Sequence, residues 1–236
     1  MATFQMHQTV GAIVREHPAL SRLFEQAQVD YCCGGKKTLA AACQHQGIDP
    51  QQFLTQLEAA VNLAEPEADV LNLSLSQLAD RIEQTHHVYL RTELPRLEGL
   101  TAKVARVHGD KDLRLPQVRD IFLALSQELT THLLKEEQIL FPLIRQLETS
   151  DARPVFHCGS LANPVGRMEF EHEEAGIALA QLRQLTDDFT PPDWACNTYR
   201  AMLDGLFQFE QDMHQHIHKE NNVLFPAAIS LEQQKS

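Results

Sequence analysis

Residues 132–142 read His-Leu-Leu-Lys-Glu-Glu-Gln-Ile-Leu-Phe-Pro, and residues 216–226 read His-Ile-His-Lys-Glu-Asn-Asn-Val-Leu-Phe-Pro. The shared His, Glu, Leu, Phe and Pro are all displaced by the same 84 residues, which indicates an internal duplication. In each copy the His and the Glu stand four residues apart. On a helix both side chains therefore lie on one face, where they could hold one metal centre.

The composition limits the kinds of partner that the chain can have. Its 236 residues, 43% of them hydrophobic, suffice for one large domain or for a medium domain with a small appendage. The balance of 20 basic against 32 acidic residues gives a net charge of −12, which disfavours nucleic acid or an anionic membrane as partner. Twelve histidines is an unusually high number for this length.

Sequence signals for export or membrane insertion are lacking. We find no run of about 18 apolar residues and no basic segment followed by an apolar one at the N-terminus, so neither a membrane span nor a signal peptide is predicted. The five cysteines are an odd number and too scattered for a disulfide framework. This usage predicts a protein of the reducing cytoplasm.

The first quarter of the chain predicts short helices broken by turns. We expect them from Thr9 to Glu16, after Pro18, from Thr38, and after Asp49-Pro50, where an N-cap residue precedes a proline at the first helical position. The segment 64–69, with two glutamates and a proline, is the expected linker. Residues 1–64 are thus predicted to form a small helical domain.

Four long helical patterns follow the linker. The first begins at a capping box, Ser74 with Gln77, and runs to Gly109, and the second runs from Pro116 to near Thr149. After an irregular connection over residues 150–163, the third runs to about residue 187 and the fourth from Thr190 through the second motif. No strand is predicted. The pattern predicts an all-α protein with an antiparallel up-down-up-down four-helix bundle over residues 70–232.

The bundle would bring six possible metal ligands together. The second and fourth helices each supply a His and a Glu, and the first and third offer one histidine each. Four imidazoles and two carboxylates are too many donors for one tetrahedral zinc, but they suit two metals if both carboxylates bridge. Each metal would then have two histidines, two carboxylate oxygens and a shared oxo, hydroxo or water ligand, with one position open. Such donors favour iron or manganese.

Residues alone leave several alternatives open. A His and Glu four apart on a helix is most often a surface pair, and the repeated Leu-Phe-Pro could serve only packing and kinks. Periodicity slightly favours His86 over His87 as the ligand from the first helix. We expect His214 and His218 to be exposed, and Glu137 and Asn221, which adjoin the proposed ligands, to point away from the site.

Two further carboxylates, Glu128 and Glu171, stand near the expected ligands in the sequence. Glu128 is one helical turn before His132, and Glu171 adjoins His172. They could support ligand histidines from outside the metal's coordination shell or relay protons and metal, or they could simply be solvated.

Together these segments resemble the hemerythrin-like di-iron proteins for repair of iron centres, the YtfE/ScdA-type family. The resemblance rests on Asp-Tyr-Cys-Cys-Gly-Gly-Lys at residues 30–36, on His87 eight residues before Pro95, and on the two duplicated motifs. It implies an oxo- or hydroxo-bridged pair of non-haem iron ions, and it selects His87 over His86. The implied ligands are His87, His132, Glu136, His172, His216 and Glu220, with Glu136 and Glu220 as the bridges.

The resemblance also implies a function. We expect a cytoplasmic stress protein that restores iron-sulfur clusters damaged by nitric oxide or peroxide, by donating iron or by acting on nitric oxide at the di-iron centre. Its partners would be iron-sulfur proteins or their assembly scaffold, with nitric oxide or oxygen as small ligand, and a homodimer is compatible with this. The alternatives are an oxygen or nitric oxide sensor or carrier without repair activity, and a purely structural bundle. Whether the protein is an enzyme stays open.

The adjacent cysteines Cys32 and Cys33 are candidate redox or transfer thiols. Two lysines and an expected helix start follow them, and both features favour the thiolate form. The alternative is two small apolar residues before a tight turn. We expect Cys43, Cys158 and Cys196 to be ordinary core or loop residues.

Overall fold

A computed structural model describes residues 4–61 and 72–235 of the chain. Contacts divide the chain into two units, one of residues 1–80, 144–161 and 214–236, the other of residues 81–143 and 162–213. Within the described ranges there are helices and no β-strand, apart from an isolated bridge between Thr9 and Thr38. The predicted all-α class is confirmed. Among the same residues, no helix is both long enough and apolar enough to cross a membrane.

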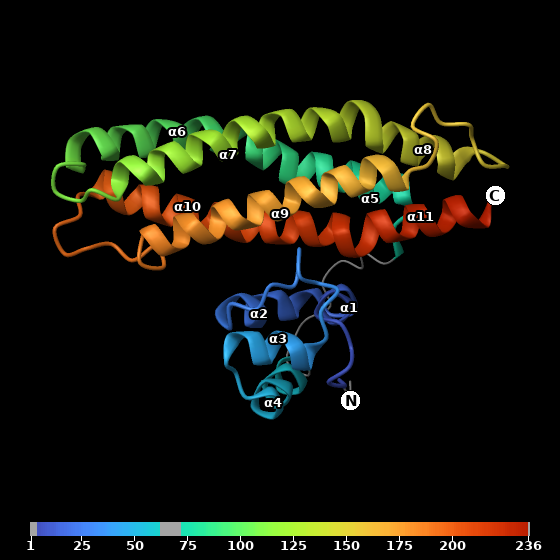
Figure 1. Cartoon of the computed structure of the whole chain (residues 1–236), viewed down its shortest axis with the longest axis horizontal. Helices are drawn as coiled ribbons and strands as arrows, with labels where there is room; N and C mark the ends of the chain where they lie inside the picture. Colours follow the sequence, from blue (N-terminus) through green and yellow to red (C-terminus); the bar gives the residue numbers. More distant parts are fainter. Residues whose placement is uncertain (1–3, 62–71, 236) are drawn as a thin grey trace. The chain divides into compact units, whose positions relative to one another are not determined.

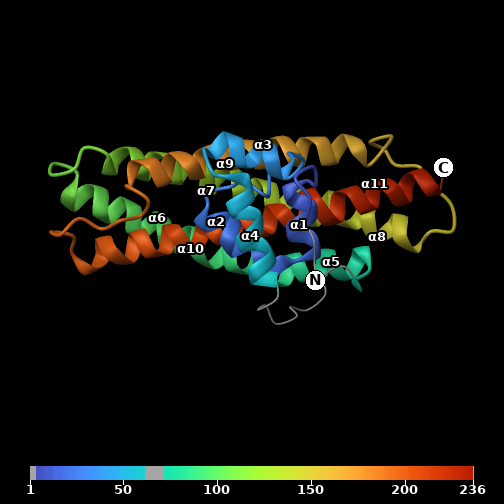
Figure 2. The ribbon, with the colours of Figure 1, turned by 90° about the horizontal axis from the view of Figure 1, so that it is seen from below.

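The second unit is built on four long helices that run side by side (Figures 1 and 2). They are α6 (Val88–His108), α7 (Leu115–Lys135), α9 (Ala162–Leu185) and the part of α10 (Asn197–Lys219) up to Met213. Helix α7 packs against both α6 and α9. An ion pair between Arg183 and Glu210 joins α9 to α10. Helix α10 also packs closely on α6, because a Cβ added at Gly205 would lie 2.7 Å from the side chain of Leu97.

Each of these helices therefore has two helical neighbours, as the predicted four-helix bundle requires. The rings of Phe122 and Phe209 meet edge to face in its core, with centroids 5.4 Å apart. One feature of the prediction is wrong, because α10 begins at Asn197 and not at Thr190. Residues 190–196 form an irregular segment with a short turn before α10, and the positive φ of Asp187, Asp188 and Phe189 ends α9.

In the part of the chain that the structure describes, three wide turns of π-helix interrupt the long helices. They are η3 (Glu83–His87), which joins α5 (Leu75–Ile82) to α6; η4 (Glu136–Leu140), which joins α7 to α8 (Phe141–Thr149); and η5 (Glu220–Leu224), which joins α10 to α11 (Phe225–Gln234). The Phe141 N–H donates to the Glu136 carbonyl and the Phe225 N–H to the Glu220 carbonyl, five residues back.

Proline gives a physical reason for two of these turns. Pro142 and Pro226 each follow the phenylalanine that closes the π turn. A proline lacks an N–H, and its ring clashes with the carbonyl four residues back in a regular α-helix. A wider turn moves that carbonyl away. The Leu-Phe-Pro repeat thus corresponds to a local change of helix type beside each duplicated glutamate.

In the first unit, residues 4–61 form short helices around a common apolar core that includes Phe24, Tyr31 and Phe53. The helices are α1 (Val10–Glu16), η1 (Pro18–Leu20), α2 (Ser21–Gln26), α3 (Leu39–Gln46) and α4 (Pro50–Val61). Thr9 and Thr38 cap α1 and α3 with their side-chain oxygens, so these predicted helix starts are confirmed. The expected linker, residues 64–69, lies outside the described residues.

The first unit also contains the predicted capping box at the start of α5. The Ser74 N–H donates to the Gln77 side-chain oxygen at 2.9 Å, and the Gln77 N–H donates to the Ser74 hydroxyl at 3.2 Å. This reciprocal pair satisfies amides that have no partner inside the helix.

Candidate metal centre

All six residues of the predicted ligand set are buried. Glu136, Glu220 and His87 have no exposed surface, and His132, His172 and His216 are at most 2% exposed. An ionised carboxylate in such surroundings is costly unless positive charge or hydrogen-bond donors compensate it. Two fully buried glutamates among four imidazoles are therefore a donor set suited to cations.

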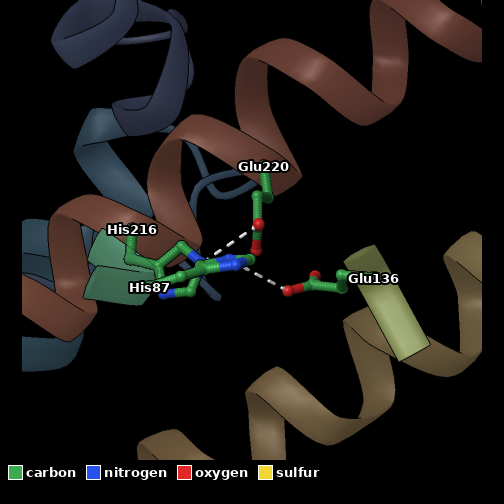
Figure 3. Close-up of side chains that lie close together, drawn as sticks. All are labelled: His87, Glu136, His216 and Glu220. Atoms are coloured by element: carbon green, nitrogen blue, oxygen red, sulfur yellow. Dashed lines mark hydrogen bonds and ion pairs between the residues drawn. The ribbon is translucent and has the colours of Figure 1, made fainter. Parts of the chain in front are cut away.

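The six residues form two overlapping groups of possible metal ligands. One group is His87, Glu136, His216 and Glu220, shown in Figure 3, and the other is His132, Glu136, His172 and Glu220. Within each group the ligand atoms all lie within 4.8 Å of one another. The groups share both glutamates and divide the four histidines equally between them.

The two oxygens of Glu136 face different histidines. Oε2 lies 3.4 Å from Nε2 of His87, and Oε1 lies 3.2 Å from Nε2 of His132. This is the arrangement that a carboxylate bridging two metal ions needs. The other distances fit the same pattern, since Nε2 of His216 lies 3.0 Å from Oε1 of Glu220, and the Nε2 atoms of His132 and His172 lie 3.1 Å apart.

The π turns place three of these side chains. Glu136 and Glu220 open η4 and η5, and His87 closes η3. A π turn changes the direction of the side chains that follow it and is frequent at functional sites. In both duplicated motifs the histidine thus lies in the last α-helical turn and its glutamate at the first widened position.

Carboxylates outside the two groups fix the orientation of two histidine rings. Glu171 lies 2.9 Å from Nδ1 of His132, and Glu137 lies 2.7 Å from Nδ1 of His87. An Nδ1–H that donates to a carboxylate leaves the Nε2 lone pair available for a metal. Both Nε2 atoms belong to the groups described above.

Both outer carboxylates are held in the charged form. Burial opposes ionisation of Glu171, but hydrogen bonds from Lys135, His132 and Arg167 outweigh it and lower its pKa to about 2. For Glu137, burial is likewise outweighed by hydrogen bonds from Arg91 and His87, so its pKa is also lowered. Each glutamate can therefore accept a hydrogen bond from the Nδ1–H of its histidine as an anion near neutral pH.

The contact of Glu137 corrects an expectation, because this residue was expected to point away from the site. Successive side chains on a helix are about 100° apart, so Glu137 faces a neighbouring helix when Glu136 faces the bundle axis. That geometry could have indicated its role. On the first helix, the structure places His87 among the donors, whereas Nδ1 of His86 lies 2.8 Å from Asp212.

Comparison with known proteins identifies both parts of the chain. Residues 78–228 match the hemerythrin HHE cation-binding domain, and residues 6–61 match the ScdA_N domain, described as a domain of unknown function. The iron-sulfur cluster repair protein YtfE of Yersinia pseudotuberculosis serotype O:1b (strain IP 31758) is 39% identical over 223 residues, covering 94% of this chain and 97% of that protein. The YtfE of Yersinia pestis (strain Pestoides F) is 38% identical over the same shares of each chain.

The chain belongs to the YtfE-type family. This confirms the resemblance that the motifs indicated, and a match to the hemerythrin HHE domain implies that the family's bundle binds iron.

A surface pocket reaches the donors of this YtfE-type bundle. It has a volume of about 450 Å³, and its lining includes His132, His172, Glu171 and Glu128. Glu128 is exposed on α7. The structure thus places Glu171 directly on a donor histidine and Glu128 in the wall of the pocket.

The Cys-Cys motif of this family member lies in the first unit, in the loop before α3. Cys32 is buried and Cys33 half-buried. A hydrogen bond with Cys33, burial, and the nearby Asp30 together raise the pKa of the Cys32 thiol. This is the opposite of the expected effect of nearby lysines, because Lys36 and Lys37 are exposed to solvent.

The same loop contacts the second duplicated motif within the first unit. The Asn222 side-chain amide donates to the Cys32 carbonyl at 3.0 Å, and Nδ1 of His218 lies 3.3 Å from the Tyr31 carbonyl. His218 is buried, so the expectation that it is exposed is wrong. Burial lowers the pKa of His218 to about 4.

Proposed function

We propose that this protein repairs iron-sulfur clusters damaged by nitrosative or oxidative stress, using iron or nitric oxide chemistry at a di-iron centre. One observation carries the proposal. Two groups of four possible ligands share Glu136 and Glu220 and divide four histidines between them. The YtfE proteins, similar to this chain over nearly their whole length, are named for iron-sulfur cluster repair.

The donor set supports two iron ions better than zinc. Two imidazoles and two carboxylate oxygens for each ion suit iron, whereas structural zinc sites take four donors in all and often include thiolates. We assign His87 and His216 to one ion, His132 and His172 to the other, and Glu136 and Glu220 as bridges. Bound iron would supply the site's redox chemistry and a coordination position for a small molecule such as nitric oxide.

The chain's own groups have three tasks in this proposal. Glu171 and Glu137 hold the Nδ1 protons of His132 and His87 and so keep Nε2 turned inward. The apolar bundle surrounds the donors and limits access of water. The pocket next to His132 and His172 gives small molecules or iron a route to the donors, with Glu128 in its wall.

We further propose two domains, residues 1–64 with the thiols Cys32 and Cys33 and residues 70–232 with the iron. The partners would be iron-sulfur proteins or the scaffold on which their clusters are assembled. Imidazole and carboxylate ligands hold ferrous iron less tightly than a thiolate cluster scaffold does, so iron could leave the centre for such a partner.

The proposal is tested by following iron into a damaged enzyme. The protein is loaded with isotopically enriched iron and incubated without oxygen with a cluster enzyme that nitric oxide has inactivated. We expect activity to return and the enriched iron to appear in the enzyme. Equimolar free ferrous iron in the presence of a chelator is the control, and it should restore less activity.

A matched variant separates repair from the alternatives. His132→Ala combined with Glu220→Ala should fold as a bundle but lose both iron and repair activity. Full iron loading with no recovery of the damaged enzyme would instead support an oxygen or nitric oxide sensor or carrier. Repair by this variant at the normal rate would contradict the assignment of the site.

A further inference from the structure

Three side chains in the loop before α3 form a second group of possible metal ligands. A carboxylate oxygen of Asp30 and the sulfurs of Cys32 and Cys33 all lie within 4.8 Å of one another. None of them belongs to the six-residue donor set of the bundle. We propose that Asp30, Cys32 and Cys33 form a mononuclear site for a thiophilic divalent metal ion, separate from the di-iron centre.

The distances fit a single ion bound by both sulfurs. The two Sγ atoms lie 3.8 Å apart, too far for a disulfide, whose S–S bond is about 2.05 Å. Two thiolates at about 2.3 Å from a tetrahedral metal are separated by about 3.8 Å. The pair is therefore already spaced for shared coordination.

The carboxylate of Asp30 is held beside the sulfurs. Its Oδ1 lies 3.3 Å from Sγ of Cys32, close to the roughly 3.6 Å expected for a sulfur and an oxygen on one tetrahedral ion. The N–H of Cys32 donates to Oδ1 at 3.0 Å, and the N–H of Gly34 donates to Oδ2 at 2.8 Å. These amides fix the orientation of the carboxylate without using all of its lone pairs.

Gly34 makes this approach possible. A Cβ added at Gly34 would lie 2.9 Å from Oδ2 of Asp30 and 3.1 Å from the Asp30 carbonyl oxygen. A larger residue would therefore push the carboxylate off its position. Gly34, the first of the two glycines after the cysteines, thus leaves the space in which the third donor is held.

The donors are arranged so that an ion can arrive from solvent. Asp30 is exposed, Cys33 is half-buried and Cys32 is buried. Binding would replace the proton of each thiol by a bond to the metal and release both protons to water. Two thiolates and one carboxylate leave one tetrahedral position for water or for a ligand from another molecule.

The chemical class of the ion follows from the donors. Thiolates favour zinc, cobalt and ferrous iron over magnesium or calcium. If the proposed repair function holds, the ion is ferrous iron in transit to a damaged cluster, and the open position is where the acceptor would bind. This last step rests on the proposed function, whereas the metal site itself does not.

Cobalt(II) is a direct probe, because only a thiolate ligand gives intense sulfur-to-cobalt charge-transfer bands in the near ultraviolet. The full chain is titrated with cobalt(II) without oxygen, and the absorption bands and released protons are recorded. We expect the bands to level off at the intensity of one ion bound by two thiolates per chain, whatever further cobalt the bundle donors take up, with release of one proton for each thiol. The imidazole and carboxylate donors of the bundle contribute no such bands.

Matched variants locate the site. Cys32→Ser combined with Cys33→Ser should abolish the bands, and Cys196→Ser, which removes an exposed thiol elsewhere, should leave them unchanged. Asp30→Asn keeps the size of the side chain but only one acceptor oxygen, so it can accept one of the two amide hydrogen bonds. It should weaken cobalt binding about tenfold or more, since even an outer hydrogen-bond partner of a ligand is worth about 10–100-fold.

Two results would overturn the site: no charge-transfer bands in the wild-type protein, or the same bands in the variant that lacks both cysteines. Circular dichroism of the variants shows whether the helices are retained, and proton release by the wild type gives a second readout that does not depend on any variant. Because cobalt binding is measured without a repair assay, failure of the site and failure of the repair function are distinguishable.

Discussion

Replacing Glu171 by glutamine tests how the bundle orients a metal ligand. The carboxylate lies 2.9 Å from Nδ1 of His132 and also accepts hydrogen bonds from Lys135 and Arg167. Glutamine keeps the size and one acceptor oxygen but removes the negative charge. The imidazole would then lose the anion that holds its Nδ1 proton and raises the basicity of Nε2.

The expected loss can be estimated from comparable contacts. Changing such an outer partner typically weakens metal binding about 10–100-fold, which corresponds to about 1.4–2.8 kcal/mol. The lost ion pairs to Lys135 and Arg167 are partly exposed, so each should change folding stability by less than about 1 kcal/mol. Iron affinity should therefore fall much more than stability.

The measurement is iron retention in competition with a ferrous chelator, beside urea unfolding of the metal-free protein. Glu173→Gln is the control, because Glu173 is exposed two positions away on the same helix. We expect Glu171→Gln to lose iron at a chelator concentration about 10–100-fold lower than the wild type. Equal retention by wild type and Glu171→Gln, or an equal loss in Glu173→Gln, would refute the reasoning.

Three further predictions concern single residues. His87→Ala should reduce the amount of bound iron, measured by elemental analysis. His86→Ala should keep most of the iron, because His86 is paired with Asp212. The reverse result would assign the ligand role to His86. Backbone amides at the start of α10 and then the imidazole of His108 lower the pKa of Cys196 to about 7. Alkylation of Cys196 by iodoacetamide, followed by mass spectrometry, should therefore rise as pH increases through about 7, below the range of an ordinary thiol. A rise only above about pH 8.5, the ordinary thiol pKa, would contradict this. Phe122→Ala should lower the free energy of unfolding, measured with urea, by about 3–5 kcal/mol, because it leaves a cavity in the bundle core. Truncating an exposed phenylalanine of α9 should lower it by less than about 1 kcal/mol. Similar losses for both variants would place Phe122 outside the core.

Most of the fold could be predicted because the signals are local and repeated. The capping box at Ser74, the caps at Thr9 and Thr38 and the long apolar stripes each depend on residues three or four apart. The start of α10 was misjudged because a proline and a capping residue at Thr190 are equally compatible with an irregular loop. Local rules do not choose between the two.

The part of the candidate site that lies in the duplicated motifs could be predicted from the sequence. The 84-residue offset singles out Glu136 and Glu220, and the structure brings them together with the expected histidines. Pro142 and Pro226 signal an interruption of the helix, but its form as a π turn was not predictable, since the hydrogen bonds of a π turn reach one residue further than those of an α-helix and leave no distinct periodicity.

Contacts between segments far apart in the chain could not be predicted from the sequence either. The burial of His218 depends on its contact with Tyr31, 187 residues away, and the ring of His87 is held by Glu137 from another helix. Helical periodicity says which side chains share a face but not what packs on it. The predicted direction of the Cys32 pKa shift is wrong for the same reason, because the hydrogen bond with Cys33 and then burial outweigh charges that are near only in sequence.

The central claim, a di-iron centre bridged by Glu136 and Glu220, is tested most directly by counting iron and examining its magnetic coupling in one sample. The protein should carry Cys32→Ser and Cys33→Ser, so that only the bundle donors contribute. After anaerobic loading and removal of loose iron, elemental analysis with Mössbauer spectroscopy should find about two irons per chain, magnetically coupled, and Glu136→Ala should lose the coupling. One iron per chain, or two uncoupled irons that Glu136→Ala leaves unchanged, would contradict the account.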